Sequence, residues 1–413
     1  MEPSVRFDRT VLAVESDGIV HLLVELQAPE APASERPPLD VVLVIDKSGS
    51  MSGEPLDAVK SAVAHMLRIA GATDRIGVVA FDNSVELVLP LDTHDTDAAI
   101  ARVQSVREGG MTNLSGGWLK GIEMLEASAR PEALRRVVLL TDGQANVGET
   151  NTDRLAGMAG AARSRNITTT TIGFGDQFDE QLLSLIADTG AGNDYWCAGP
   201  DHAPQIFNDE FEGLASTVAQ NVSIELRPAD TIVDYGVLNE FPMTAVPGGV
   251  QVALGDAYGN ERRRLVAKLV LPEVRAEGAF PLGEAIVRWA TVGDDIELHT
   301  VTIPLAIGVS SDPDAIDEAA DPEVIEHVNV LRAAEERKKA QERIDAGDWK
   351  GASLSLESAA MLLEDIGGDV ASIRELRIDA QRLIRHDWDL ASSKKLNATR
   401  RSDSQGRRKR YDQ

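Results

Sequence analysis

The stretch from Asp40 to Gly53, DVVLVIDKSGSMSG, combines a buried-strand pattern with side chains that could do chemistry. Five apolar residues lead directly to Asp46, and hydroxyl groups follow at Ser48 and Ser50. A carboxylate followed by alternate hydroxyls suits a nucleophile, a phosphate site, a metal site or a simple turn. Other loops of the chain have to distinguish these possibilities.

Two further loops carry polar side chains where strand-like and helical segments meet. Thr112 lies in REGGMTNLSGG (107–117), before a helical pattern, and Asp142 lies in LLTDGQANVG (139–148), directly after a strand-like run. Ligands of open α/β sheets collect at the carboxyl ends of the strands. If the first and fourth strands of this unit are neighbours, five polar residues converge on one small volume: Asp46, Ser48, Ser50, Thr112 and Asp142.

Three hydroxyls and two carboxylates around one point suit a hard divalent cation, Mg²⁺ or Mn²⁺. Positions two apart in an extended turn point the same way, so Ser48 and Ser50 can bind one ion. The carboxylates can hold bound waters and orient the hydroxyls. Two other interpretations stay open, namely a metal that only holds three loops together and a hydrogen-bonded polar cluster without metal.

Other chemistries fit these residues less well. A phosphatase of the haloacid dehalogenase type needs a second aspartate two positions after the first, where Ser48 stands, and a serine-hydrolase elbow needs a serine where Met51 stands. The chain has no G-x-x-x-x-G-K-[ST] phosphate loop, and GFGDQF (173–178) lacks the third glycine of a dinucleotide fingerprint. The seven histidines are scattered, which disfavours a zinc site, and Cys197 reads as an ordinary buried thiol.

The segment that carries these loops, residues 38–219, alternates short apolar strands with helical patterns. This alternation predicts a doubly wound α/β unit with a mainly parallel sheet. Only Asp82, Asn83 and Ser84 separate the second and third strands, so one strand must run antiparallel. The six predicted strands are 40–46, 75–81, 85–91, 135–142, 167–175 and 193–198.

The flanking segments have a different character. Residues 220–310 contain strand-like runs joined by Gly, Pro or Asp, which predicts a small antiparallel β-sandwich. Residues 1–37 contain similar runs, so we expect the two segments to form one sandwich into which the α/β unit is inserted. Residues 323–390 predict a helical hairpin with an extra helix, similar to a single tetratricopeptide-like unit.

Charge is unevenly distributed along the chain. The last 22 residues carry eight Lys and Arg and two Asp, a net charge of +6, so the remaining 391 residues carry -32 of the total of -26. The acidic body is a poor candidate for nucleic-acid binding. Residues 391–413 are predicted to be a disordered basic tail that could contact an acidic surface.

The chain has features of a cytoplasmic protein. No apolar run approaches the roughly 20 residues that a transmembrane helix needs. The N-terminal sequence MEPSVRFDRT shows no signal-peptide pattern. Cys197 is the single cysteine, so no intrachain disulfide can form, which fits a reducing compartment.

The motif set resembles the von Willebrand factor A domain with its metal-ion-dependent adhesion site. DKSGS matches the D-x-S-x-S signature through Asp46, Ser48 and Ser50, Thr112 matches the second element, and Asp142 in TDG matches the third. The resemblance implies a Rossmann-like fold and a bound Mg²⁺ or Mn²⁺. It also implies that the hydroxyls contact the metal directly while the aspartates act largely through water. The flanking sandwich resembles bacterial A-domain proteins and the central region of inter-alpha-trypsin inhibitor heavy chains.

This resemblance implies a protein-interaction module rather than an enzyme, in which an acidic residue of a protein partner fills an open metal position. The alternative is a non-ATPase subunit of a metal-dependent enzyme complex, similar to the A-domain subunit of magnesium chelatase. That subunit is coupled to an ATPase domain, and no ATPase motif occurs in this chain. A scaffold role therefore remains the first expectation.

Overall fold

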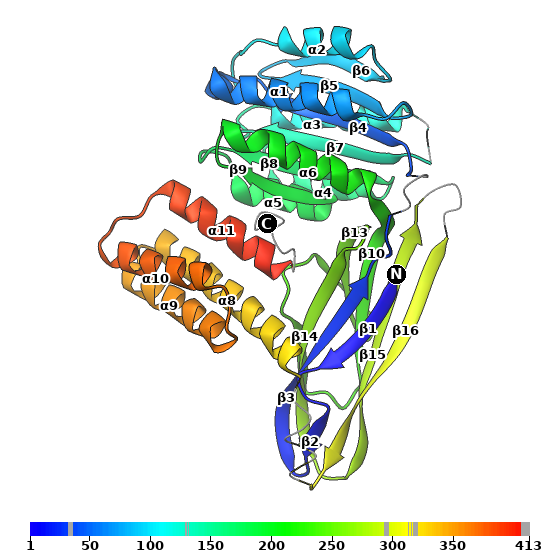
Figure 1. The fold of residues 1–413 in the computed structure, drawn as a ribbon, viewed down its shortest axis with the longest axis vertical. Helices are drawn as coiled ribbons and strands as arrows, with labels where there is room; N and C mark the ends of the chain where they lie inside the picture. The colour runs from blue at the N-terminus through cyan, green and yellow to red at the C-terminus, as the bar shows by residue number, and fades with distance from the viewer. Residues whose placement is uncertain are drawn as a thin grey trace.

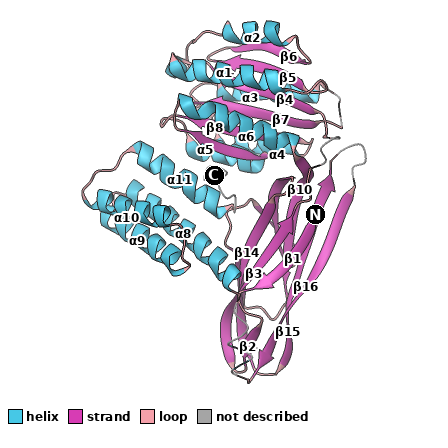
Figure 2. Ribbon diagram, in the orientation of Figure 1, coloured by secondary structure: helices cyan, strands magenta, loops and turns pink. Residues whose placement is uncertain are grey.

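The computed structural model describes residues 1–405 except 32–35, 129, 131, 293–296, 313, 315 and 317–320. The α/β unit stands at one end of an elongated molecule, a β-sandwich extends from it, and a group of helices lies beside both (Figures 1 and 2). The residue pattern of each segment explains the secondary structure of the corresponding part.

The α/β unit is built on a six-stranded sheet with the order β6-β5-β4-β7-β8-β9. Every neighbouring pair is parallel except β5 and β6, because a connection of three residues can only join antiparallel strands. The strands are β4 (Leu39–Asp46), β5 (Arg75–Phe81), β6 (Val85–Asp92), β7 (Leu134–Thr141), β8 (Ile167–Phe174) and β9 (Ala191–Cys197).

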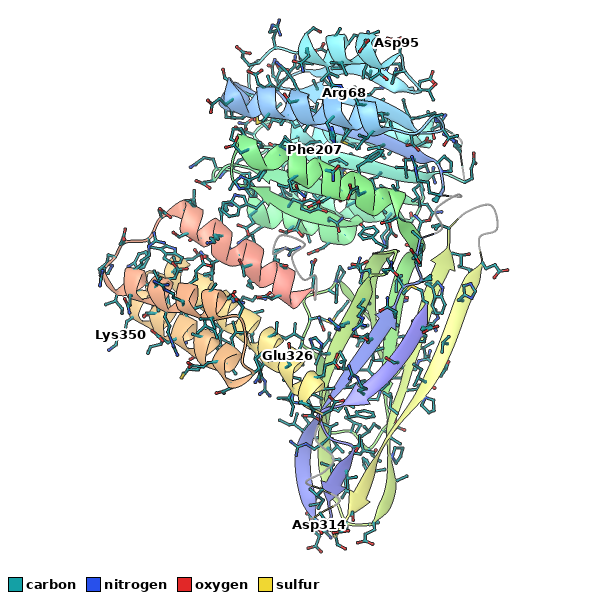
Figure 3. The ribbon with its side chains drawn as sticks, viewed as in Figure 1. Arg68, Asp95, Phe207, Asp314, Glu326 and Lys350 are labelled. Atoms are coloured by element: carbon teal, nitrogen blue, oxygen red, sulfur yellow. The ribbon has the colours of Figure 1, made fainter. Side chains whose placement is uncertain are left out.

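Helices cover both faces of this sheet, as its alternating side chains require. Val41 and Leu43 of β4 pack with α1 and α6 on one face, where Phe207 of α6 lies in the same core (Figure 3). Val42 and Val44 pack with α3 on the other face. The helices are α1 (Glu54–Ile69), α2 (Thr96–Gln104), α3 (Leu114–Glu126), α4 (Thr152–Arg163), α5 (Glu180–Thr189) and α6 (Ala203–Ala215), with short 3-10 turns η1 (Gly49–Met51) and η2 (Pro200–His202).

Two sheets form the β-sandwich, with the orders β1-β3-β14-β11 and β12-β13-β10-β15-β16-β2. Their strands pair antiparallel as predicted, except that β2 runs parallel to β16. The N-terminal β3 pairs with β14, and β2 pairs with β16, so both sheets combine strands from before and after the α/β unit. The bounds are β1 (Glu2–Phe7), β2 (Val11–Ala13), β3 (Ser16–Gln27), β10 (Thr217–Pro228), β11 (Asp234–Val237), β12 (Met243–Val246), β13 (Gly249–Tyr258), β14 (Arg262–Val274), β15 (Gly278–Thr291) and β16 (Leu298–Ser310).

The helical region packs against both other parts. Its helices are α8 (Pro322–Asp345), α9 (Trp349–Asp365), α10 (Val370–Ile384) and α11 (Leu390–Ser404). Small residues such as Ala333, Ala340 and Ala352 lie in its core and let the helices approach closely. Val324 and Val328 of α8 pack on Leu23 of the sandwich. No helix among the described residues is long and apolar enough to cross a membrane.

The prediction of a disordered tail over 391–413 is wrong for residues 391–404, which belong to α11. Lys394 Nζ donates to the carbonyl oxygen of Phe178 at 3.0 Å and pairs with Glu180 at 3.2 Å. Arg401 pairs with Asp188 at 2.9 Å and with Asp194 at 2.6 Å. The basic side chains therefore hold the helix on the α/β unit. Residues 406–413 of the predicted tail lie outside the described part of the chain.

Candidate metal centre

Sheet order brings the five expected residues to one edge of the α/β unit. β4 and β7 are neighbours, with Ile45 opposite Leu140, so Asp46 at the end of β4 and Asp142 just after β7 lie at the same level. Ser48 and Ser50 follow β4 directly, and Ser50 is part of the short turn η1. Thr112 lies two residues before α3.

Asp46 is completely buried, and its carboxylate is held from two sides. Oδ1 accepts a hydrogen bond from the backbone N–H of Ser48 at 2.8 Å, and Oδ2 accepts one from Thr141 Oγ1 at 2.5 Å. Burial raises the pKa of Asp46 to about 6, against the lowering effect of these hydrogen bonds, and the nearby charge of Asp142 adds to the rise. A positive charge at this point would stabilise the ionised form.

Hydroxyl groups connect the two carboxylates. Ser48 Oγ lies 3.2 Å from Ser50 Oγ, and Ser50 Oγ donates to Asp142 Oδ1 at 2.7 Å. Burial also raises the pKa of Asp142 above its usual range, against the hydrogen bond from Ser50. Asp46, Ser48, Ser50 and Asp142 thus form one continuous polar chain across the ends of two strands.

Thr112 reaches the same space from the third loop. Its backbone N–H donates to Asn146 Oδ1 at 2.9 Å, and its carbonyl oxygen accepts from the N–H of Asn146 at 3.2 Å, which fixes the loop against the segment after β7. A methyl group placed on Gly143 would lie 3.4 Å from Thr112 Oγ1 and 3.8 Å from Ser50 Oγ. The two hydroxyls therefore open onto one space beside Gly143, and the structure brings all five expected residues together.

The donor set fits a divalent cation. Oxygen ligands that include neutral hydroxyls are what Mg²⁺ and Mn²⁺ accept. Among the described residues, no Lys or Arg forms an ion pair with Asp46 or Asp142, and the adjacent Lys47 pairs with Glu86 at 3.0 Å instead. The buried carboxylate of Asp46 and the half-buried carboxylate of Asp142 thus have no cationic partner among the described residues, and a bound cation would supply the missing charge.

Sequence reasoning missed several residues that hold the site. Thr141 orients Asp46, and Asn146 fixes Thr112. Asp82, at the end of β5, accepts from the N–H of Gly110 at 3.2 Å and so holds the Thr112 loop. Asp82 and Asn146 could have been suspected because they too follow strand ends. The inward direction of Thr141 depends on the register between β4 and β7, which sequence alone does not supply.

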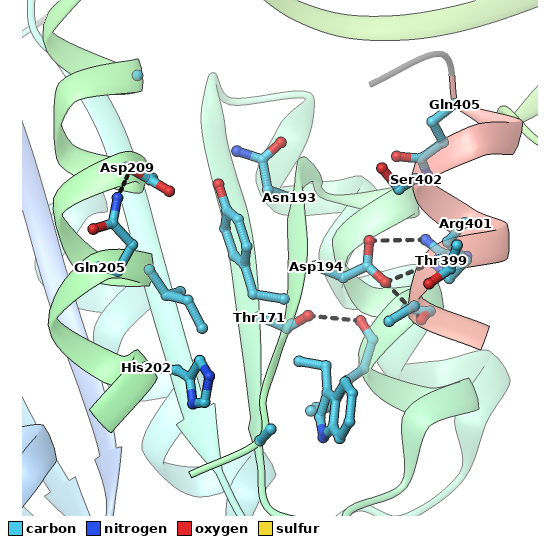
Figure 4. A pocket seen from close by; sticks show the side chains of 18 of the residues that line it. Thr171, Asn193, Asp194, His202, Gln205, Asp209, Thr399, Arg401, Ser402 and Gln405 are labelled. Carbon is cyan, nitrogen blue, oxygen red and sulfur yellow. Dashed lines mark hydrogen bonds and ion pairs between the residues drawn. The ribbon is translucent and has the colours of Figure 1, made fainter. Parts of the chain in front are cut away.

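A separate cavity of about 760 Å³ lies between the α/β unit, the sandwich and α11. His202, Gln205 and Asp209 line one side of it, and Asp194, which pairs with Arg401, lies across from them (Figure 4). Its described lining includes none of the five residues of the metal centre. The cavity and the metal centre are therefore distinct features.

Comparisons with known proteins agree with this geometry. Residues 40–208 match the family model of the von Willebrand factor type A domain, a family that commonly binds a divalent metal and commonly mediates protein–protein interaction. The chain is 28% identical over 336 residues to an uncharacterized protein of Synechocystis sp., covering 79% of this chain and 78% of that one. It is 25% identical over 381 residues to the E3 ubiquitin-protein ligase WAV3 of Arabidopsis thaliana, covering 86% of this chain and 46% of the ligase.

Inter-alpha-trypsin inhibitor heavy chain H3 of Homo sapiens is 27% identical over 206 residues, which cover 48% of this chain and 23% of the heavy chain. The chain thus spans less than half of the length of the ligase and of the heavy chain.

Solved structures share the whole architecture. A von Willebrand factor type A protein from Catenulispora acidiphila superposes with a TM-score of 0.75 over 96% of each chain, at 18% identity. The ArnB paralog VWA2 from Sulfolobus acidocaldarius gives a TM-score of 0.62 over 98% of each chain, also at 18% identity. At this identity the likeness concerns the fold alone. Residues 40–208 of this chain are thus a von Willebrand factor type A domain.

Proposed function

We propose that the chain is a metal-dependent protein-interaction scaffold that captures a carboxylate of a protein partner at the site of Asp46, Ser48, Ser50, Thr112 and Asp142. One observation carries the proposal. The hydroxyls of Thr112 and Ser50 open onto the same space beside Gly143, next to the buried Asp46 and the half-buried Asp142, which have no cationic partner among the described residues.

Some residues of the site would bind the metal, and others hold those side chains in position. Thr141 and the N–H of Ser48 fix Asp46, and Ser50 is fixed by Asp142, so the oxygens keep one arrangement. When bound, Mg²⁺ or Mn²⁺ would supply positive charge that three neutral hydroxyls do not cancel. The acidic chain, with a net charge of -26, would otherwise repel an acidic partner. A local cation would therefore make carboxylate capture specific to this edge of the sheet.

We propose binding rather than catalysis, and therefore no enzyme activity of the chain itself. A metal-assisted hydrolase needs a general base beside the ion. Asp46 and Asp142, the carboxylates of the site, are both occupied with holding hydroxyl or amide groups. The chelatase-like alternative shares the metal site and differs only in requiring a separate ATPase partner.

The proposed compartment is the cytoplasm. It is supported by the single cysteine, Cys197, which is buried and whose pKa is raised to about 11 by that burial. Such a thiol fits a structural position rather than a redox site.

The test is capture of partners on the immobilised full chain, with proteins identified by mass spectrometry. The proposal expects a protein retained in Mg²⁺, released by EDTA and equally lost with Thr112→Ala. Thr93→Ala, an exposed threonine at the opposite end of the sheet, should retain it. Partners that stay bound under EDTA and with Thr112→Ala would show that the metal only holds the loops together, which would refute the proposal.

A further inference from the structure

The strand β6 forms one outer edge of the α/β sheet, and its first residues lie beside the metal centre. In the described part of the chain, β6 is the terminal strand in the sheet order and pairs with β5 alone. Val85 stands opposite Phe81, and Phe81 stands opposite Asp46. The beginning of β6 is therefore level with the end of β4 where the metal centre begins.

This beginning of β6 is exposed and apolar. Val85 is 39% exposed and Leu87 is 48% exposed, and Glu86 between them also faces solvent. Natural sheets protect their edge strands with proline, charge or a covering element. On β6 the proline, Pro90, lies in the half that is distant from the metal centre. The half next to the metal centre has no proline, and its one charged side chain, Glu86, pairs with Lys47 at 3.0 Å.

The backbone of this half directs its hydrogen-bonding groups outward. Phe81 uses its carbonyl oxygen to accept from the N–H of Lys47 at 2.8 Å, so Phe81 faces β4. Its antiparallel partner Val85 therefore points its own N–H and C=O away from β5, and Leu87, two residues on, does the same. No other strand pairs with this edge in the described part of the chain.

A rigid connection joins this edge to the metal centre. The carboxylate of Asp82 accepts from the N–H of Ser84 at 2.8 Å and from the N–H of Gly110 at 3.2 Å, and its backbone carbonyl accepts from the N–H of Asn113 at 2.8 Å. Burial opposes ionisation of Asp82, but the hydrogen bonds from Ser84 and Gly110 and the charge of Lys47 lower its pKa. The hairpin before β6 and the Thr112 loop thus form one surface, and Met111, 55% exposed, lies on it.

We propose that the partner segment that fills the metal centre is an extended peptide that adds as a strand to the outer edge of β6. The inference rests on the proposed function, since it assumes that a partner carboxylate binds there. Val85 and Leu87 lie on the same face, so the peptide offers apolar or β-branched side chains at alternate positions. An antiparallel direction is favoured because such pairing is the more stable one.

Geometry also sets the spacing of the partner's acidic residue. From the added strand to β4 the sheet spans three strand spacings, roughly 14 Å, and an extended chain covers roughly 3.3 Å per residue. The Asp or Glu therefore stands about four residues beyond the paired segment, after the chain has crossed the hairpin and Met111.

A defined synthetic peptide tests the inference on the full chain. The probe is fluorescein-labelled Thr-Val-Thr-Val-Thr-Gly-Gly-Gly-Asp with an amidated C-terminus, whose affinity is measured by anisotropy in Mg²⁺ up to about 1 mM protein. We expect Leu87→Pro, which removes one outward N–H, to weaken binding by about tenfold or more. Leu87→Thr keeps that N–H and the strand preference, so its effect should stay below about threefold. Mg²⁺ affinity, measured by calorimetry, should be unchanged in both variants.

Hydrogen exchange gives a second measurement, which is needed if Leu87→Pro disturbs the strand β6 itself. The amides of Val85 and Leu87 should become protected when the peptide binds, and the Asp→Asn peptide should bind at least about tenfold more weakly.

Mg²⁺-dependent binding that is unaffected by Leu87→Pro and leaves both amides unprotected would overturn the edge inference while leaving the proposed function intact. Protection that persists in EDTA and with the Asn peptide would contradict the proposed function, and the link to the metal with it. Absence of any binding would overturn the edge inference.

Discussion

Two clusters of carboxylates border the α/β sheet, and they differ in whether a basic side chain neutralises them. At the junction with the sandwich, Arg136 of β7 is fully buried and binds Glu210 of α6 at 2.8 Å and Asp256 of β13 at 2.9 Å. At the metal centre, Asp46 and Asp142 have hydroxyl and amide partners but no Lys or Arg partner among the described residues. The first cluster thus contains a basic side chain that neutralises its carboxylates, and the metal centre has none among the described residues.

The pKa values of Glu210 and Asp46 follow this difference, whereas burial raises the pKa of Asp256 despite the charge of Arg136. Burial opposes ionisation of Glu210, but the charge of Arg136 and hydrogen bonds from Thr170 and Asn193 outweigh it and lower the pKa of Glu210. Burial of Asp46 is not offset in this way, and its pKa rises to about 6. Glu210 has an internal counter-ion and therefore a structural role, and the proposed metal would supply the counter-ion that Asp46 lacks among the described residues.

The largest effect is expected from breaking the internal cluster. Arg136→Met leaves Glu210 and Asp256 buried without their cation, which should lower the free energy of unfolding by about 3–5 kcal/mol. Chemical denaturation followed by circular dichroism measures the loss. Arg154→Met, which breaks the exposed pair with Glu149, is the control and should cost less than about 1 kcal/mol. Similar costs in both variants would contradict the contrast between the two clusters.

At the metal centre, an added cation should supply the positive charge that Asp46 and Asp142 lack, and should therefore stabilise the folded chain. Mg²⁺ at about a hundred times its Kd should raise the free energy of unfolding by about 2.7 kcal/mol, because it binds the folded state. Asp46→Ala should abolish this gain, while Asp92→Asn, an exposed carboxylate at the other end of β6, should keep it. Equal gains in both variants would place the ion elsewhere.

A smaller effect on Mg²⁺ affinity is expected from substituting Thr141, which orients Asp46 but is not one of the expected metal ligands. Thr141→Val removes the hydroxyl that donates to Asp46 Oδ2 while keeping the shape of the side chain. Mg²⁺ affinity should fall about tenfold, as is typical of partners that hold a ligand in place. Thr171→Val removes a buried hydroxyl of the neighbouring β8 and should leave the affinity unchanged. Unchanged affinity with Thr141→Val would mean that Asp46 needs no orienting partner.

Much of this arrangement could be predicted from sequence because the relevant signals are local. Apolar runs ending in Asp46 and Asp142 indicated strand ends, and the three-residue gap between β5 and β6 indicated the antiparallel edge. The order of β4 beside β7 then followed as the condition for convergence, and the structure confirms that order.

The features that were missed depend on contacts between distant parts of the chain. The basic composition of residues 391–413 indicates solvation, yet Lys394 and Arg401 find Glu180, Asp188 and Asp194 more than 200 positions earlier. Likewise, the sequence alone does not distinguish Arg136 from an arginine on the surface, because its partners Glu210 of α6 and Asp256 of β13 are distant in the sequence. Composition alone cannot show which charges will meet a buried partner.

Titration calorimetry of the full chain with Mg²⁺ and Mn²⁺ tests the central claim most directly. The arrangement of Asp46, Ser50 and Thr112 around one space predicts a single ion bound per chain in the wild type. Asp46→Ala should abolish that binding while the circular dichroism spectrum stays the same. Binding of one ion with undiminished affinity in Asp46→Ala, or no binding in the wild type, would contradict the assignment of this site.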